Sequence, residues 1–154
     1  MTDRYVTGKI PRAALLLGLA GLIPFLAAAA AQWTRLPLLA PDTGLRLAIV
    51  YGAIILSFLG GIRWGTAIGP YDSGRQTMEF SASVLGSLAG LAAAFLPTIP
   101  ALALLIAGFL MQGLWDVMSV DAGRLPNWFG RLRMILTAGA VISLIAALLA
   151  VIVT

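Results

Sequence analysis

Long apolar segments separated by short polar or proline-containing stretches dominate this chain. Five of them, residues 13–31, 47–68, 80–96, 101–118 and 132–153, are 17 to 22 residues long. A helix needs about 20 mostly apolar residues to cross the hydrocarbon core of a bilayer. The pattern therefore predicts an all-α fold, a polytopic five-helix transmembrane bundle that forms a single domain over residues 1–154. Because five is odd, the two chain ends are expected on opposite sides.

The first apolar segment has a second interpretation. Its basic start, apolar middle and alanine-rich end also suit a secretory signal peptide cleaved near Ala31. The apolar run is longer than a typical signal core, so we expect a membrane span instead. Pro24 interrupts this span, because proline removes one backbone hydrogen bond from a helix.

The small residues of the second and third segments recur at a spacing of four. Four residues make about one helical turn, so each set lies along one face of its helix. In lipid, such faces let two helix backbones approach closely. We therefore expect the second and third spans to pack as an antiparallel pair through Ala53, Ser57, Gly61, Gly65 and Gly69 on one helix and Ala82, Gly86, Gly90 and Ala94 on the other.

Ionisable side chains inside the apolar segments are rare, and two of them are predicted to share one layer. Arg63 and Asp116 each lie about six residues or fewer from the carboxyl end of their spans, and in the predicted threading these two ends are on the same, cytoplasmic side of the membrane. One hypothesis is an ion pair at the edge of a polar pocket open to the cytoplasm, with Gln112, Thr66, Ser83 and Thr137. The alternative is that Arg63 reaches the lipid phosphates and Asp116 caps a loop.

Tryptophan occurs near the ends of the predicted spans. An indole ring favours the headgroup level of a bilayer, so we expect interfacial anchors at Trp33, Trp64, Trp115 and Trp128. Pro126, just before Trp128, also predicts the start of an interfacial helix, since proline suits a first helical turn.

Basic residues flank the spans unequally. The predicted threading puts eight on the amino-terminal side and only Arg35 and Arg46 on the other; the eight are Arg4, Lys9, Arg12, Arg63, Arg75, Arg124, Arg131 and Arg133. Lysine and arginine accumulate on the cytoplasmic side of membrane proteins. We therefore expect a cytoplasmic amino terminus, or a matrix-side one in an organelle, and an external carboxyl terminus.

Composition supports the membrane class and narrows the chemistry. Of 154 residues, 60% are hydrophobic and 10% charged, against roughly 25% charged in soluble domains. The net charge of +4 reflects topology and predicts no nucleic-acid partner. Cysteine and histidine are absent, which excludes disulfides, thiolate or imidazole metal sites and histidine bases. Asp116 and Asp121 are five apart and face different ways. We expect no metal site, no cofactor, no catalytic residue and no enzyme.

Two motifs resemble a known family. Residues 57–65, with the sequence Ser-Phe-Leu-Gly-Gly-Ile-Arg-Trp-Gly, and residues 125–133, with Leu-Pro-Asn-Trp-Phe-Gly-Arg-Leu-Arg, are similar to those of the transmembrane protein 69-like family. The resemblance extends over most of the chain. It implies a small multi-pass protein of the bacterial inner membrane, or of mitochondria in eukaryotes, and no established activity.

Three classes of function follow for such a chain, of which we expect the first, with the second as its alternative. The first is a non-enzymatic accessory or assembly subunit of a membrane complex, because small-residue faces suit a membrane-protein partner or a homo-oligomer. The second is a carrier or sensor that binds a small molecule or lipid in the polar pocket around Arg63 and Asp116. An enclosed cavity reaching that layer would favour it. The third, an intramembrane enzyme, is disfavoured by the missing catalytic residue types.

Overall fold

The structure, a computed structural model, describes residues 8–34, 36–69 and 73–153. Six α-helices follow one another: α1 (Arg12–Ala20), α2 (Ile23–Trp33), α3 (Pro41–Ala67), α4 (Ser73–Phe95), α5 (Thr98–Asp121) and α6 (Asn127–Val153). Within the described ranges the chain contains no β-strand beyond one isolated bridge between Leu36 and Leu39. The predicted all-α class is confirmed.

Five helical segments are long and apolar enough to cross a bilayer, with α1 and α2 together forming the first. They contain 22 to 27 residues, which at about 1.5 Å per residue exceeds the hydrocarbon thickness of roughly 30 Å. The outward face is apolar as well: Leu38, Phe58 and Phe95 are 98%, 71% and 84% exposed. The chain is therefore a multi-pass membrane protein whose surface contacts lipid.

The helices extend beyond the apolar runs. α3 begins at Pro41 rather than 47, α4 at Ser73 rather than 80, and α6 at Asn127 rather than 132. The stretch between the predicted second and third spans is helical from Ser73 onward, and residues 70–72 lie outside the described ranges. Hydropathy marks only the part of a helix that lies in hydrocarbon, whereas polar residues continue the helix into the headgroup layer. As a result, Glu79 lies on a helix that faces the bundle.

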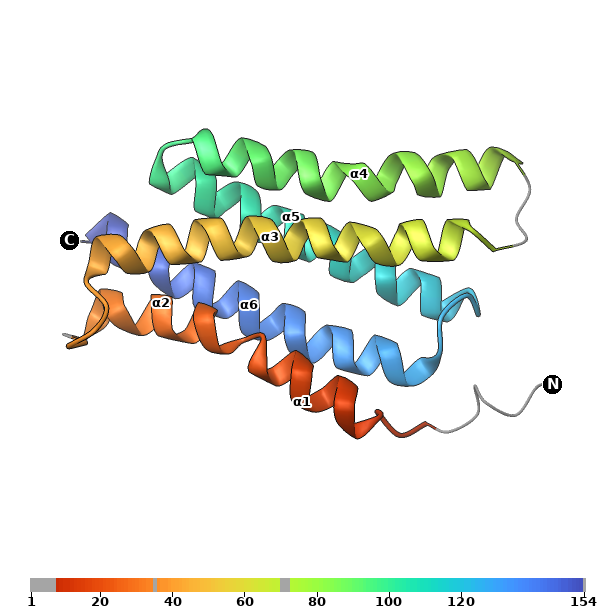
Figure 1. Ribbon diagram of the computed structural model, residues 1–154, viewed down its shortest axis with the longest axis horizontal. Coiled ribbons are helices and arrows are strands. Elements are labelled where there is room, and N and C mark those ends of the chain that lie inside the picture. Colours follow the sequence, from red (N-terminus) through yellow and green to blue (C-terminus); the bar gives the residue numbers. More distant parts are fainter. Residues whose placement is uncertain (1–7, 35, 70–72, 154) are drawn as a thin grey trace.

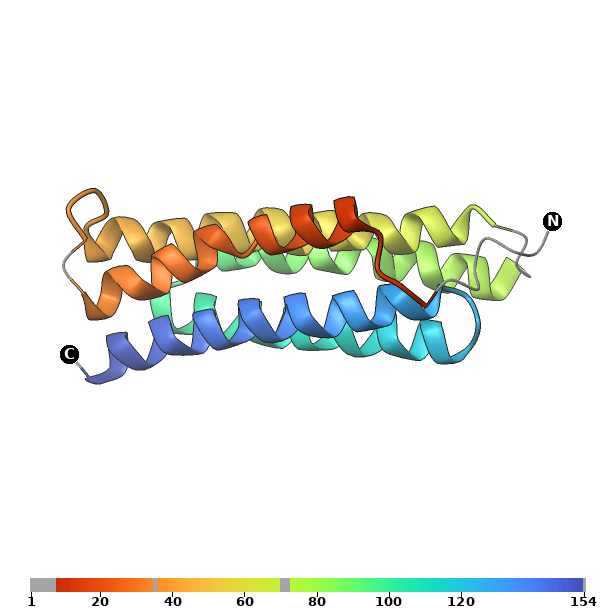
Figure 2. The ribbon, with the colours of Figure 1, turned by 90° about the horizontal axis from the view of Figure 1, so that it is seen from below.

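The helices form one elongated bundle (Figure 1). α3 and α4 lie side by side in opposite directions and make the most extensive contact, followed by α5 with α6 and α2 with α3. Figure 2 shows α1, α2, α3 and α4 on one side of the bundle and α5 and α6 on the other. The core between them contains Phe25, Leu56, Leu105, Phe109 and Leu144. In Figure 1, α1 begins within the right-hand half of the bundle and α6 finishes at its left end.

The first span is broken between α1 and α2, at Gly21 and Leu22. Pro24 lies in the first turn of α2 and has no N–H to donate to the preceding turn. Tyr51 of α3 donates its hydroxyl to the Gly21 carbonyl oxygen at 3.0 Å, and its ring packs edge-on against Phe25. In lipid, a break in a helix needs such a substitute partner. On the amino-terminal side of the break, α1 diverges from α3 (Figure 1).

Small residues bring α3 and α4 close together, but the contacting set differs from the expected one. A Cβ on Gly86 would lie 2.6 Å from the Leu56 carbonyl oxygen, and one on Gly90 would lie 2.8 Å from that of Ala53. A Cβ on Gly60 would overlap the Ser83 carbonyl oxygen. The hydroxyls of Ser57 and Ser87 lie 2.8 Å apart across the same contact. Gly60, next to the predicted Gly61, is therefore the point of closest approach.

The expectation for Gly61, Gly65 and Ala94 is corrected. No described atom lies within 4 Å of a Cβ built on Gly61 or Gly65. Ala94 is exposed, whereas its neighbour Ala93 is fully buried. Four residues exceed one helical turn by about 40°. Residues spaced exactly four apart therefore move around the helix axis, and Gly61 points about 80° away from the direction of Ala53. Gly69 belongs to the turn after α3, and Ala82 is buried.

Candidate functional site

Four ionisable side chains from four different helices meet inside the bundle. Arg63 of α3 lies 3.9 Å from Glu79 of α4 and 3.7 Å from Asp116 of α5, and Arg133 of α6 lies 2.7 Å from Asp116. All four are only 2–5% exposed. Each lies four to six residues from the end of its helix, so the group forms one layer about 6–9 Å below the helix ends. We call these four residues the charge cluster.

Arg63 is the most highly connected member of the charge cluster. Its Nε donates to the Gln112 side-chain oxygen at 2.8 Å, and its guanidinium carbon lies 4.3 Å from the centre of the Trp115 ring. Such a cation–π contact is strongest away from water. The structure thus brings Arg63, Asp116 and Gln112 together, as the sequence analysis expected.

Arg133 and Glu79 belong to the charge cluster, although neither was among the residues predicted for the site. Glu79 precedes the predicted span 80–96, and Arg133 was counted among the basic residues that flank the last span, because hydropathy placed the starts of α4 and α6 too late. One signal was available: Gly130, Arg133, Thr137 and Ala140 have the three- and four-residue spacing of a single helix face. If the helix begins soon after Pro126, this face places Arg133 inside the bundle.

The formal charge of the charge cluster is balanced, with two arginines and two carboxylates. Burial of an unpaired charge in lipid costs several kcal/mol, whereas paired and hydrogen-bonded charges are tolerated. Because the carboxylates are already paired with cations, the arrangement resembles a structural cross-link between α3, α4, α5 and α6. Within the described ranges, no group of three or more metal-binding side chains is close enough to hold an ion.

The predicted polar pocket open to the cytoplasm is corrected in two respects. First, the charge cluster is closed, since Asp116 is 2% and Arg63 4% exposed. Second, Thr66 and Ser83 donate their hydroxyls to carbonyl oxygens of their own helices, those of Arg63 and Phe80. Thr137 is buried one turn beyond Arg133, and its hydroxyl has no hydrogen-bond partner among the described residues. These short side chains satisfy local backbone groups more readily than they reach across the bundle.

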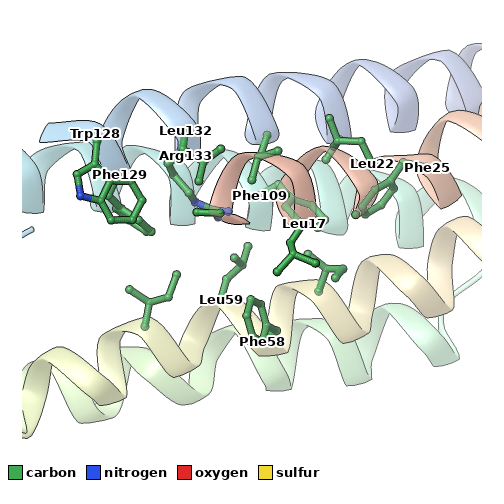
Figure 3. Close-up of a pocket in the computed structure, with 17 residues that line it drawn as sticks. Leu17, Leu22, Phe25, Phe58, Leu59, Phe109, Trp128, Phe129, Leu132 and Arg133 are labelled. Atoms are coloured by element: carbon green, nitrogen blue, oxygen red, sulfur yellow. The ribbon is translucent and has the colours of Figure 1, made fainter. Parts of the chain in front are cut away.

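An apolar pocket lies instead beside the charge cluster, between α1, α2, α3, α5 and α6. It has a volume of about 420 Å³, within the range of ligand sites in proteins. Figure 3 shows Arg133 extending from α6 among otherwise apolar side chains. The wall includes Leu17, Leu22, Phe25, Phe58, Leu59, Phe109, Trp128, Phe129, Leu132 and Arg133. We call this cavity the lateral pocket.

The mouth of the lateral pocket faces the apolar exterior of the bundle. Leu17 on α1 and Phe58 on α3 line the pocket and are 74% and 71% exposed. The pocket exists because α1 diverges from α3 beyond the proline break. A lipid-soluble molecule could therefore enter from the hydrocarbon without crossing a polar barrier. A smaller cavity of about 160 Å³ between α3, α4 and α5 touches Arg63, Gln112 and Trp115.

The four tryptophans have different surroundings. Trp33 and Trp64 are about half exposed, near the ends of α2 and α3. Trp33 also donates to the Ala146 carbonyl oxygen on α6 at 3.0 Å. Trp115 and Trp128 are partly buried, one against Arg63 and the other in the lateral pocket. α6 starts directly after Pro126, as expected, but runs unbroken into the last span.

Comparison with known proteins agrees with the resemblance seen in the two motifs. The profile of a family described as "Protein of unknown function (DUF3429)" matches residues 10–149. Transmembrane protein 69 of Xenopus tropicalis is 41% identical over 151 residues, which is 90% of this chain and 54% of that protein. The chain thus spans about half the length of this curated relative, and no solved structure matches. The chain belongs to the DUF3429 family of proteins of unknown function and is similar to transmembrane protein 69.

Proposed function

We propose that this membrane protein binds a small lipid-soluble molecule in the lateral pocket, as a carrier or sensor. The observation that supports this function is a pocket of about 420 Å³ whose mouth is formed by exposed apolar side chains. The pocket reaches the layer of the charge cluster, because Arg133 belongs to both. A cavity with an apolar wall and a single charged group is typical of small-molecule sites.

The proposed role is not catalytic. The sequence has no histidine or cysteine and one lysine, Lys9, which precedes α1. The two buried carboxylates are engaged with arginines. A general base must be free to take a proton, and a nucleophile needs an activating neighbour.

Filling the lateral pocket should abolish binding without disturbing the fold. Ala14 of α1 lines the pocket, whereas its neighbour Ala13 is exposed and does not. We expect Ala14→Phe to lower binding of an apolar fluorescent probe, diphenylhexatriene, at least tenfold, because the added phenyl group projects into the pocket and would clash with a probe bound there. Ala13→Phe, which adds the same side chain on the lipid side, should bind as the parent does.

The measurement is a titration of the purified full chain in lipid nanodiscs, with empty nanodiscs subtracted. Equal loss in both variants, or no saturable binding by the parent chain, would contradict the proposed function. A parallel thermal unfolding curve in detergent separates loss of the pocket from loss of the fold.

A second candidate is an accessory or assembly subunit. The observation in its favour is the exposed face of α3 at Gly61 and Gly65, where no described side chain fills the space. Phe58 and Trp64 flank this face and are 71% and 51% exposed. In lipid, exposed glycines let a second helix approach closely. The same face would serve a second copy of the chain.

For this second function, Gly61→Leu should remove a partner that co-purifies stoichiometrically in mild detergent. The added side chain would block close approach of a helix while leaving α3 and α4 undisturbed. Ala138→Leu, on an exposed part of α6, is the control and should retain the partner. Mass spectrometry of the intact complex identifies the component that Gly61→Leu has lost. If the parent chain purifies alone and as a monomer, the accessory role is excluded.

We propose the bacterial inner membrane as the location, with the amino-terminal side of α1 in the cytoplasm. The support is the charge distribution: Lys9, Arg12, Arg75, Arg124 and Arg131 flank the spans at one end, and Arg46 is near the other. Arg4 and Arg35, two of the basic residues that were assigned to the two sides from the sequence, lie outside the described residues. An organelle membrane is the alternative, because the similar protein comes from Xenopus tropicalis.

A further inference from the structure

Two buried nitrogens of Arg133, in the wall of the lateral pocket, make no hydrogen bond of good geometry, Nε and Nη2. Nε is nevertheless ion-paired with Asp116 at 2.7 Å, which leaves Nη2. The Nη2 atom of Arg133 is inaccessible to solvent and makes no hydrogen bond to any described residue. The side chain as a whole is 5% exposed. Buried donors are almost always satisfied in proteins, and an unsatisfied one is more costly still where no water is present. The orphaned Nη2 therefore indicates a missing acceptor.

The position of Arg133 limits where this acceptor can come from. Its Nε lies 2.7 Å from Oδ2 of Asp116, so this side of the guanidinium already has an anionic partner. The same guanidinium extends among the side chains that line the lateral pocket (Figure 3). The rest of the wall is apolar apart from the indole N–H of Trp128, and it contributes no side-chain acceptor. A molecule in the pocket that carries an acceptor can satisfy Nη2 after a small movement of the guanidinium, because as placed this atom exposes less than 1 Å² of surface.

The charge cluster indicates that this acceptor is neutral. Arg63 and Arg133 are already balanced by Glu79 and Asp116. A carboxylate or phosphate in the pocket would add a third negative charge close to Asp116, and like charges at short range repel strongly in a low-dielectric interior. A carbonyl oxygen accepts the hydrogen bond without adding charge.

We propose that the lateral pocket binds a neutral lipid-soluble molecule that carries a carbonyl group, and that this carbonyl accepts a hydrogen bond from Nη2 of Arg133. The apolar body of the ligand extends from Arg133 toward Phe109 and Phe25, along the aromatic wall. The carbonyl chemistry fits either an alkylated quinone or the acyl ester of a lipid. This inference rests on the proposed binding function and adds the ligand class and the residue that recognises it.

The test compares four probes on the full chain released from detergent micelles, with binding measured by native mass spectrometry. Decylubiquinone and methyl oleate carry neutral carbonyl groups, oleate is anionic, and octadecene has no polar group. We expect one or both carbonyl probes to bind roughly ten- to a hundredfold more tightly than octadecene, the usual range for a hydrogen bond to a charged group. The tighter of the two identifies the source of the carbonyl.

Arg133→Lys isolates the hydrogen bond, because lysine keeps a positive charge for Asp116 but removes the guanidinium Nη2. This variant should lose most of the preference for carbonyl probes, measured as the ratio of their affinity to that of octadecene in the same variant. Arg131→Lys, an exposed residue outside the pocket, should behave as the parent chain. Should Arg133→Lys fail to fold, the ranking of the four probes on the parent chain still decides the question.

The outcomes separate the two proposals. Tightest binding of oleate, or equal binding of all four probes with no effect of Arg133→Lys, would overturn the carbonyl assignment and leave the binding function intact. If no probe binds the parent chain and Ala14→Phe changes nothing, the binding function itself is wrong.

Discussion

Asp116→Ala should destabilise this protein by about 3–5 kcal/mol, the usual effect of breaking a buried ion pair by removing one partner. Asp116 lies 2.7 Å from Arg133 and 3.7 Å from Arg63, so its loss leaves Glu79 as the single carboxylate of the charge cluster beside two buried arginines. Neither arginine can reach water by a small movement, because both are at most 5% exposed. The free energy of unfolding, measured by titrating the detergent-solubilised protein with dodecyl sulfate, reports the effect.

Asp121→Ala provides the matched control for Asp116→Ala. Asp121 is the last residue of α5 and is exposed, so its removal should change stability by less than about 0.5 kcal/mol. The double variant Asp116→Ala with Arg133→Ala should lose less than the sum of the two single losses, because it removes an ion pair together. Additive losses, or equal effects at the two aspartates, would show that the charge cluster does not link the helices.

Gly60→Ala should separate α3 from α4 and cost about 1–3 kcal/mol, the range found for overpacked interiors. The added methyl group would overlap the carbonyl oxygen of Ser83, a backbone atom that cannot rotate away. Relief would require the two helices to move apart along their most extensive contact. The same dodecyl sulfate titration measures the loss.

Gly61→Ala is the matched control one residue away. No described atom lies within 4 Å of its added methyl group, and alanine stabilises a helix over glycine by about 1 kcal/mol. The two neighbouring substitutions should therefore have opposite signs. If both stabilise, or both destabilise by the same amount, Gly60 does not face α4 and the orientation of α3 about its own axis is incorrect.

The two predictions concern features that depend on each other. The close approach of α3 and α4 at Gly60 brings Arg63, three residues further on, within reach of Glu79. The ion pairs of Asp116 then connect these helices to α5 and α6. The charge cluster fixes one end of the lateral pocket, and the proline break supported by Tyr51 shapes the other.

Part of the candidate site could be predicted from single residues. Arg63, Gln112 and Asp116 stand out because polar side chains are costly inside an apolar segment and must find partners. Glu79 did not stand out because it lies just before the apolar run 80–96, and Arg133 did not because it is the second residue of the run 132–153, where a basic residue is usual. They enter the bundle only because α4 and α6 begin several residues earlier than hydropathy indicates.

No pattern in the sequence predicts the lateral pocket. Its wall combines α1, α3 and α6 with single residues of other helices, and each contributes ordinary leucine, phenylalanine or glycine side chains. Pro24 predicted an interruption of the first span, but the direction in which α1 diverges depends on Tyr51 and on packing against α6. A cavity is a property of several helices placed together, so no single segment encodes it.

The membrane class, the all-α fold and the five spanning segments follow from the order of residues along the chain, because the transfer of apolar residues into lipid depends on local composition. Three features emerge only from the packing of the helices: Gly60 rather than Gly61 contacts α4, Arg133 and Glu79 complete the charge cluster, and the cavity opens sideways. These features depend on the rotation and offset of each helix against its neighbours. Side-chain packing sets both, to within a fraction of a turn that hydrophobic periodicity cannot resolve.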